Sequence, residues 1–194
     1  MESAVEIVIV NATRSTPNVL VFGHKPDGTP DPTDAWQVLA NVNATRDSLL
    51  IYPRDTEVAA SYDGGRFNTR PRAVTEKRRS FEVVSRSDGG ADLVALADPV
   101  QPAGAIAVAN KAGRELDVML IKGTRPFVRQ SLSDQQNVVV ELEDVLYVSA
   151  TPPGGGDASP AARVDLSGIA QMTVELSGGE GDYKFTVTDV VRRD

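Results

Sequence analysis

The chain has 194 residues, of which 41% are hydrophobic and 24% are charged, and its formal net charge is −7 at pH 7. This composition is that of an ordinary globular protein, and its acidity disfavours binding to nucleic acid or to anionic lipid headgroups. The chain has no cysteine and one histidine. Disulfides, Cys-ligated zinc, iron–sulfur clusters and thiol nucleophiles are therefore excluded, and we expect no cofactor.

The first ten residues do not have the pattern of a secretory signal peptide. Glu2 and Glu6 stand where a signal peptide carries positive charge, and the apolar stretch is short. No run approaches the ~20 apolar residues of a membrane helix. We expect a cytoplasmic protein, or one exported without a classical signal peptide, with no transmembrane segment.

Short β-rich runs, separated by Gly, Pro, Asn and Asp, follow one another along the chain. In segment 4–10, Val5, Ile7 and Ile9 alternate on one face, and in 35–43 Trp36 and Val38 do the same. A bend near residues 143–144 is expected to divide the long run 137–149. Further strands are predicted at 18–23, 48–52, 56–62, 66–68, 79–86, 91–97, 105–109, 115–122, 125–132, 162–167, 170–177 and 182–191.

Four turn signals predict hairpins between neighbouring strands. Three of them contain glycine pairs, at 63–65, 88–90 and 178–181, and the fourth is Asn110-Lys111-Ala112-Gly113 between 105–109 and 115–122. Residues 131–137 are the best helical candidate, because Ser133 and Asp134 could cap one short turn there.

About ten to thirteen strands with turns every 8–12 residues predict an all-β fold, a single antiparallel β-sandwich over residues 1–194 with little helix. Residues 152–160 are rich in Pro and Gly and predict a flexible surface loop. Too few residues follow this loop to form a separate core, so we expect them to complete the same sandwich. No repeat of fixed period is visible.

Three aromatic residues are candidates for a ligand-binding surface. Trp36, Tyr52 and Tyr62 could line a glycan site or a lipid-facing edge if they are exposed. The apolar alternation around Trp36 also fits a core position.

One basic cluster interrupts the acidic chain. It could bind an anionic sugar, a phosphate or the acidic surface of another subunit, although a solvated loop face has the same composition. Its members are Arg66, Arg70, Arg72, Lys77, Arg78 and Arg79.

The loop 24–34 holds Asp27, Asp31 and Asp34, which form a weak candidate calcium site. Their spacing departs from the alternating pattern of calcium loops, and Asp-Gly and Asp-Pro turns explain it equally. The one histidine, His24, follows a predicted strand and fits a surface turn. We therefore predict no catalytic residue.

Residues 35–42 (AWQVLANV), 51–53 (IYP) and 57–63 (EVAASYD) resemble a group of microbial proteins of similar length. The shared pattern is a Trp-Gln-Val strand, a Tyr-Pro step and a small-residue segment before a glycine turn. The resemblance implies a β-sandwich and no established activity. Some members carry an automatic label of aromatic ring-opening dioxygenase, but non-haem iron needs two histidines and a carboxylate, and this chain has one histidine.

These observations leave three hypotheses about function. The first is a non-enzymatic β-sandwich that acts by binding or self-association, as a homo-oligomer or assembly component. The second is a carbohydrate- or lipid-binding module, lectin-like or cytolysin-like, that uses exposed aromatic residues. The third is a hydrolase with an atypical site at His24.

Overall fold

A computed structural model describes residues 4–97, 104–179 and 182–193, and these residues form seventeen β-strands and no helix. The all-β prediction is confirmed, and the strands are more numerous than predicted. They belong to two compact units: unit 1 contains residues 1–54 and 144–194, and unit 2 contains residues 55–143. This division differs from the single sandwich predicted over 1–194, because the chain leaves unit 1 after Arg54 and returns to it at Asp144.

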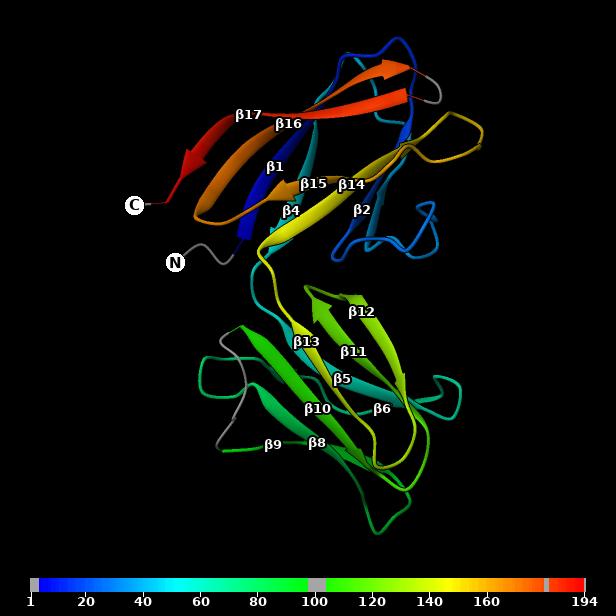
Figure 1. Cartoon of the computed structure of the whole chain (residues 1–194), viewed down its shortest axis with the longest axis vertical. Helices are drawn as coiled ribbons and strands as arrows, with labels where there is room; N and C mark the ends of the chain where they lie inside the picture. The colour runs from blue at the N-terminus through cyan, green and yellow to red at the C-terminus, as the bar shows by residue number, and fades with distance from the viewer. Residues whose placement is uncertain (1–3, 98–103, 180–181, 194) are drawn as a thin grey trace. The chain divides into compact units, whose positions relative to one another are not determined.

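Unit 1 consists of two four-stranded sheets (Figure 1). The first has the spatial order β17 (Asp182–Arg192), β16 (Ile169–Gly179), β1 (Ala4–Asn11) and β4 (Ser48–Pro53). The second has the order β15 (Ala162–Asp165), β14 (Val145–Thr151), β2 (Asn18–Phe22) and β3 (Gln37–Leu39). Alternate residues of β1 are buried, as the period of two predicts, and Val5, Ile7 and Ile9 belong to the core.

Unit 2 also consists of two sheets (Figure 1). One has the order β13 (Asn137–Glu141), β10 (Ala105–Lys111), β8 (Ser80–Ser85) and β9 (Ala91–Ala95). The other has the order β12 (Arg125–Leu132), β11 (Leu116–Lys122), β5 (Glu57–Tyr62) and β6 (Phe67–Asn68), and β7 (Arg72–Ala73) pairs with β5 beside β6.

The two units share one topology. In unit 1, β1 pairs in parallel with β16 and antiparallel with β4, and in unit 2, β10 pairs in parallel with β8 and antiparallel with β13. Likewise β2 lies between β14 and β3, as β11 lies between β5 and β12. When unit 1 is read from β14 through β17 and then from β1 through β4, each of its strands has a counterpart in unit 2, where only β7 has no equivalent. Unit 1 is therefore a circularly permuted counterpart of unit 2.

A buried asparagine occupies the same place in both units. Asn11 ends β1 and Asn110 lies near the end of β10, and their side chains are 3% and 0% exposed. Each side chain accepts a hydrogen bond from the backbone N–H two residues later and donates to backbone carbonyls, two for Asn11 and three for Asn110, over 2.7 to 3.0 Å. The partners are Thr13, Ser15 and Val42 in unit 1, and Ala112, Arg114, Leu132 and Ser133 in unit 2.

A hydroxyl residue also anchors the edge of one sheet in each unit. In unit 2, Thr69 donates its N–H to the Ala60 carbonyl at 2.8 Å, and its hydroxyl accepts the Ala60 N–H at 2.9 Å. Ser159 makes the same two bonds to Ala150 in unit 1. The residue separation is 9 in both cases. The shared asparagine and this shared hydroxyl residue show that the two units correspond in individual hydrogen bonds as well as in strand order.

Several predicted local features are confirmed and others are wrong. The strands meet as predicted across the turns at 63–65 and 88–90, and the last two strands pair, although residues 180–181 of their turn lie outside the described part of the chain. The hairpin predicted across 110–113 is wrong, because β10 and β11 belong to different sheets. The predicted helical turn at 131–137 is instead the end of β12, a turn and the start of β13.

Two predicted segments need adjustment. Segment 35–43 contributes only Gln37–Leu39 as strand. The Pro/Gly-rich segment 152–160 contains no strand, yet Ser159 within it is 2% exposed and hydrogen-bonded to Ala150, so the end of this loop is anchored to β14. The bend predicted at 143–144 is confirmed, and it coincides with the return of the chain to unit 1.

A candidate binding site at the loop end of unit 2

Three connections of unit 2 meet at one end of the unit, which we call the loop end: 63–66 after β5, 86–90 after β8 and 112–115 after β10. Arg114 joins them, because its Nη2 donates to the Gly89 carbonyl at 3.1 Å and its Nη1 lies 4.0 Å from Asp63 Oδ2. Gly113 extends the contact to a fourth connection by donating its N–H to Asp134 Oδ1 at 2.9 Å. The buried Asn110 holds the Arg114 carbonyl and thereby positions this arginine.

The turn after β5 requires a left-handed backbone. Asp63, Gly64 and Gly65 have φ values of 54°, 66° and 85°. Glycine adopts such values without steric cost, and Asp is among the few other residues that tolerate them. The Asp-Gly-Gly sequence therefore allows a tight reversal that brings Phe67 directly opposite Tyr62 in the antiparallel register.

An aromatic pair forms the centre of the site. The Tyr62 and Phe67 rings stack with their centroids 5.5 Å apart and an interplanar angle of 19°. The Arg114 guanidinium carbon lies 5.3 Å from the centroid of the Tyr62 ring, within the range of a cation–π contact. Tyr62 is 8% exposed, whereas Phe67 is 53% exposed. The pair therefore presents one supported aromatic face to solvent.

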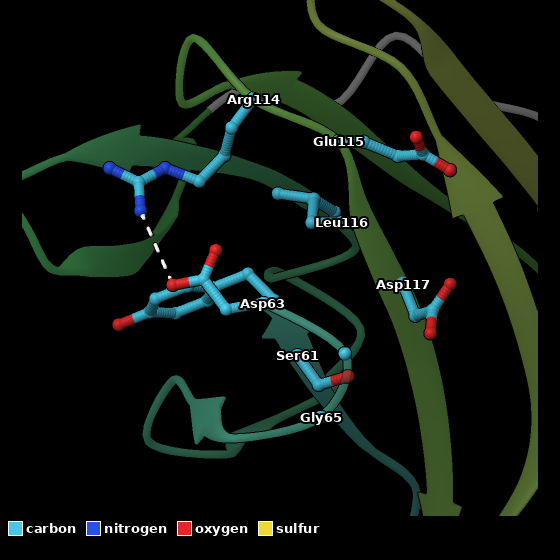
Figure 2. A pocket seen from close by; sticks show the side chains of 9 residues that line it. Ser61, Asp63, Gly65, Arg114, Glu115, Leu116 and Asp117 are labelled. Atoms are coloured by element: carbon cyan, nitrogen blue, oxygen red, sulfur yellow. Dashed lines mark ion pairs between the residues drawn. The ribbon is translucent and has the colours of Figure 1, made fainter.

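Two hollows flank this pair, and Tyr62 and Asp63 line both of them. The first has a volume of about 400 Å³ and is shown in Figure 2, where Arg114 reaches towards Asp63. The second has a volume of about 320 Å³ and adds the Phe67 ring. Besides Tyr62 and Asp63, the charged and hydroxyl side chains are Ser61, Arg114, Glu115 and Asp117 around the first hollow, and Arg86 and Asp88 around the second.

Intramolecular contacts hold several of these polar groups in place. Arg86 lies 2.7 Å from Asp88 and 3.8 Å from Asp92, and the Gly90 N–H donates to Asp88 at 2.9 Å. Asp117 accepts a hydrogen bond from Ser131. Exposed ion pairs contribute little to stability, but they restrict the rotamers of the charged groups. The site thus combines an exposed ring with carboxylate acceptors and guanidinium donors.

The matching end of unit 1 differs in chemistry. A hollow of about 450 Å³ is lined there by Ala12, Thr13, Arg14, Ser15, Gly178 and Gly179, none of which is aromatic. Thr13 and Ser15 bond to each other and to Asn11, so this end is polar and has hydroxyl groups. The exposed aromatic stack distinguishes the loop end of unit 2 from its counterpart.

The structure brings only one of the three predicted aromatic residues to this site. Trp36 and Tyr52 are 6% and 2% exposed, and their rings pack edge to face at 5.4 Å in unit 1. The core position of Trp36 is confirmed. The exposed aromatic surface predicted for Trp36, Tyr52 and Tyr62 is wrong, because all three side chains are buried. Only Tyr62 contributes to the candidate site, where it supports Phe67.

The basic cluster follows the edge of a sheet. Arg66, Arg70 and Arg72 flank or belong to the short edge strands β6 and β7, and these three and Arg78 are exposed, while Arg79 is half-buried. The Nε of Arg72 donates to the Leu93 carbonyl at 3.2 Å. Charged residues and a proline on an edge strand prevent unwanted strand pairing. The predicted contact with an anion or a subunit stays a prediction.

The calcium prediction is not supported. Among the described residues, no group of three or more His, Cys, Asp or Glu is placed to hold a metal ion, and this includes Asp27, Asp31 and Asp34. The Asp31 carboxylate instead accepts hydrogen bonds from the hydroxyl and the N–H of Thr33, both at 2.7 Å, and these bonds lower the pKa of Asp31. His24 lies in an exposed bend after β2, as the sequence predicts.

Sequence reasoning missed most of the loop-end residues. It found the turns at 63–65, 88–90 and 110–113 but assigned no function to Asp63, Phe67, Arg86, Asp88 and Arg114. The sequence did contain three glycine-containing turns with charged residues. These turns form a site only because the strand order places them at the same end of unit 2.

Comparisons with protein-family models, with curated protein sequences and with solved structures find no significant match. The resemblance of residues 35–63 therefore remains an expectation. Across the described part of the chain, the structure contains no helix long and apolar enough to cross a membrane.

Proposed function

We propose that this chain is a non-enzymatic binding protein that recognises a glycan at the loop end of unit 2. The observation that carries the proposal is the Tyr62–Phe67 stack, in which a buried ring supports a ring that is 53% exposed. An exposed, rigidly supported aromatic ring can pack against the apolar face of a sugar ring at low cost in side-chain entropy.

The polar groups around the stack suit the same class of ligand. Sugar hydroxyls both donate and accept hydrogen bonds. The carboxylates of Asp63 and Asp88 can accept hydrogen bonds, and the guanidinium groups of Arg86 and Arg114 can donate them. Both hollows have volumes within the usual range for small-molecule sites. Mixed charge favours an uncharged polar ligand, because a strongly anionic or cationic ligand would meet like charges.

The test is a glycan array, followed by calorimetric titration of the bound glycan. Phe67→Ala should weaken binding about tenfold, which corresponds to about 1.4 kcal/mol, because it removes the exposed ring. Arg114→Ala should weaken binding as well. Leu49→Ala, at a 58%-exposed apolar residue of unit 1, and Arg125→Ala, at an exposed arginine of unit 2, are matched controls and should leave the affinity unchanged.

Two results with glycans would contradict the proposal, and a third comes from lipid vesicles. One is the failure of the folded protein to bind any glycan on the array. The other is binding that Phe67→Ala and Leu49→Ala affect equally. Sedimentation with neutral phosphatidylcholine vesicles provides the comparison with a lipid ligand, and binding to vesicles without binding to glycans would also refute recognition of a glycan.

A further inference from the structure

Unit 1 is assembled from two separate segments of the chain. The N-terminal half, residues 4–54, contributes β1 to β4, and the C-terminal half, residues 144–193, contributes β14 to β17. The boundary between the halves runs through the middle of both sheets, between β16 and β1 in one sheet and between β14 and β2 in the other. Neither half forms a complete sheet of unit 1.

Unit 2 has the same internal boundary but a different connection. Its corresponding halves are β5 to β9 and β10 to β13, and the chain passes directly from β9 to β10. In unit 1 the corresponding strands, β17 and β1, are not consecutive, and the chain joins the two halves through the whole of unit 2 instead. The direct contacts between the halves of unit 1 are noncovalent.

Those contacts are extensive and specific. The parallel register runs from Glu6 opposite Gln171 to Asn11 opposite Leu176, and the antiparallel register runs from Asn18 opposite Thr151 to Phe22 opposite Tyr147. They bury side chains on both sides, among them Ile9 and Val174, each 0% exposed. Each half therefore specifies its partner half by backbone register and by core packing.

Arg54 clamps the two halves. It is the last residue of the N-terminal half, and its guanidinium group bonds three groups of the C-terminal half: Asp144 Oδ2 at 2.9 Å, the Leu166 carbonyl at 2.9 Å and the Ile169 carbonyl at 2.8 Å. The side chain is 20% exposed. Loss of these hydrogen bonds and of the ion pair should make it easier for the halves to separate.

We propose that copies of this chain associate with one another by exchanging halves of unit 1, so that the C-terminal half of one copy pairs with the N-terminal half of another. The exchanged unit 1 contains the same pairings as the closed one, so the difference in free energy is mainly the entropy of association. Reciprocal exchange between two copies gives a closed dimer, and continued head-to-tail exchange gives a longer assembly. This inference does not depend on the proposed glycan site.

Concentration should control the exchange. Closure within one chain is an intramolecular event with an effective concentration on the order of millimolar for short connections. We therefore expect monomers in dilute solution and exchanged species after refolding of concentrated protein. Arg54→Ala should speed the exchange of native protein, because the Arg54 contacts must break before the halves can separate.

Engineered disulfides can test the exchange directly, because the native chain has no cysteine. Val8 and Thr173 face each other across the parallel pairing of β1 and β16, and both are half-buried. Neighbouring strands lie about 4.8 Å apart, within the range of Cα separations that a disulfide can bridge. The matched control joins Ala107 and Ser80, which hold the equivalent positions in the pairing of β10 and β8 within unit 2.

The protein with Val8→Cys and Thr173→Cys is refolded from urea at several concentrations, oxidised and run on a non-reducing gel. We expect covalent dimers or longer species that increase with concentration, whereas the Ala107→Cys and Ser80→Cys control should yield only monomers. Monomers alone for both variants at every concentration would overturn the proposal.

A second experiment covers the case in which the cysteine variants do not fold. Two differently tagged copies of the cysteine-free chain are mixed, unfolded and refolded together at high concentration. Copurification of the two tags is expected after joint refolding. When the native copies are mixed without unfolding, it should develop faster for Arg54→Ala than for Arg125→Ala. Failure to copurify after joint refolding would overturn the proposal.

Discussion

Asn110 offers a direct test of the buried asparagine that both units share. Its side chain is fully buried, donates to the carbonyls of Arg114, Leu132 and Ser133, and accepts a hydrogen bond from the N–H of Ala112. Asn110→Ala removes the side-chain partner of the Ala112 N–H and one hydrogen bond to each of the Arg114, Leu132 and Ser133 carbonyls. A buried polar group that loses its partner costs about 1–3 kcal/mol, so we expect unit 2 to lose about 3 kcal/mol of stability.

Urea unfolding can measure this loss with two probes. The single tryptophan, Trp36, lies in unit 1, so its fluorescence follows unit 1, whereas far-ultraviolet circular dichroism follows the strands of both units. With a slope of about 1.5 kcal/mol/M, a loss of about 3 kcal/mol lowers the midpoint of unit 2 by about 2 M. The circular dichroism transition should show this shift, and the Trp36 transition should be less affected.

The equivalent change in unit 1 is the matched comparison. Asn11→Ala should lower the midpoint of the Trp36 transition, because Asn11 makes the corresponding bonds to Thr13 and Val42. Asn137→Ala, at an exposed position, should change neither transition. A midpoint shift below about 0.5 M for Asn110→Ala would refute the argument, since it would correspond to less than about 1 kcal/mol.

Two further predictions concern unit 1. Burial raises the pKa of Tyr52 well above its usual value, and the charge of Asp144 adds to this effect. The folded state therefore holds the phenol proton more tightly than the unfolded state does. The contribution of Tyr52 to stability should be complete below pH ~10 and should fall as the pH rises further. An ultraviolet titration should show a late phenolate phase that Tyr52→Phe removes, and titration of all tyrosines of the folded protein near pH 10 would contradict this reasoning. Gly178→Ala should destabilise the β16–β17 hairpin by about 1–3 kcal/mol, because residue 178 has φ +89° and the added Cβ would clash with the carbonyl oxygen of Asp182. Gly179→Ala is the control, because the Cβ added there has open space. Equal melting temperatures for the two variants would rule out the strain.

The sequence by itself determined the local structure of this protein. Alternation of apolar residues located the strands 4–10 and 79–86, because side chains of a strand point to opposite faces with a period of two. Glycine pairs located the turns at 63–65 and 88–90, because left-handed backbone excludes most other residues. The apolar alternation around Trp36 placed it in the core.

Beyond the three confirmed hairpins, only the tertiary structure decided which strands pair. Segments 105–109 and 115–122 have the pattern of a hairpin, yet the Asn110 side chain bonds the connection between them so that the chain crosses from one sheet to the other. A period of two shows which side chains share a face but does not specify the partner strand, since any apolar strand of similar length satisfies the same pattern.

The division into two units and the candidate site depend on such long-range pairings. The relation between the units is a permutation of strand order, and it is visible in sequence only as weak matches such as IVIVN at 7–11 and IAVAN at 106–110. The stacking of Phe67 on Tyr62 and the reach of Arg114 to Asp63 require three turns to lie at one end of unit 2. Hydrogen bonds between distant strands set that arrangement, and no local pattern encodes it.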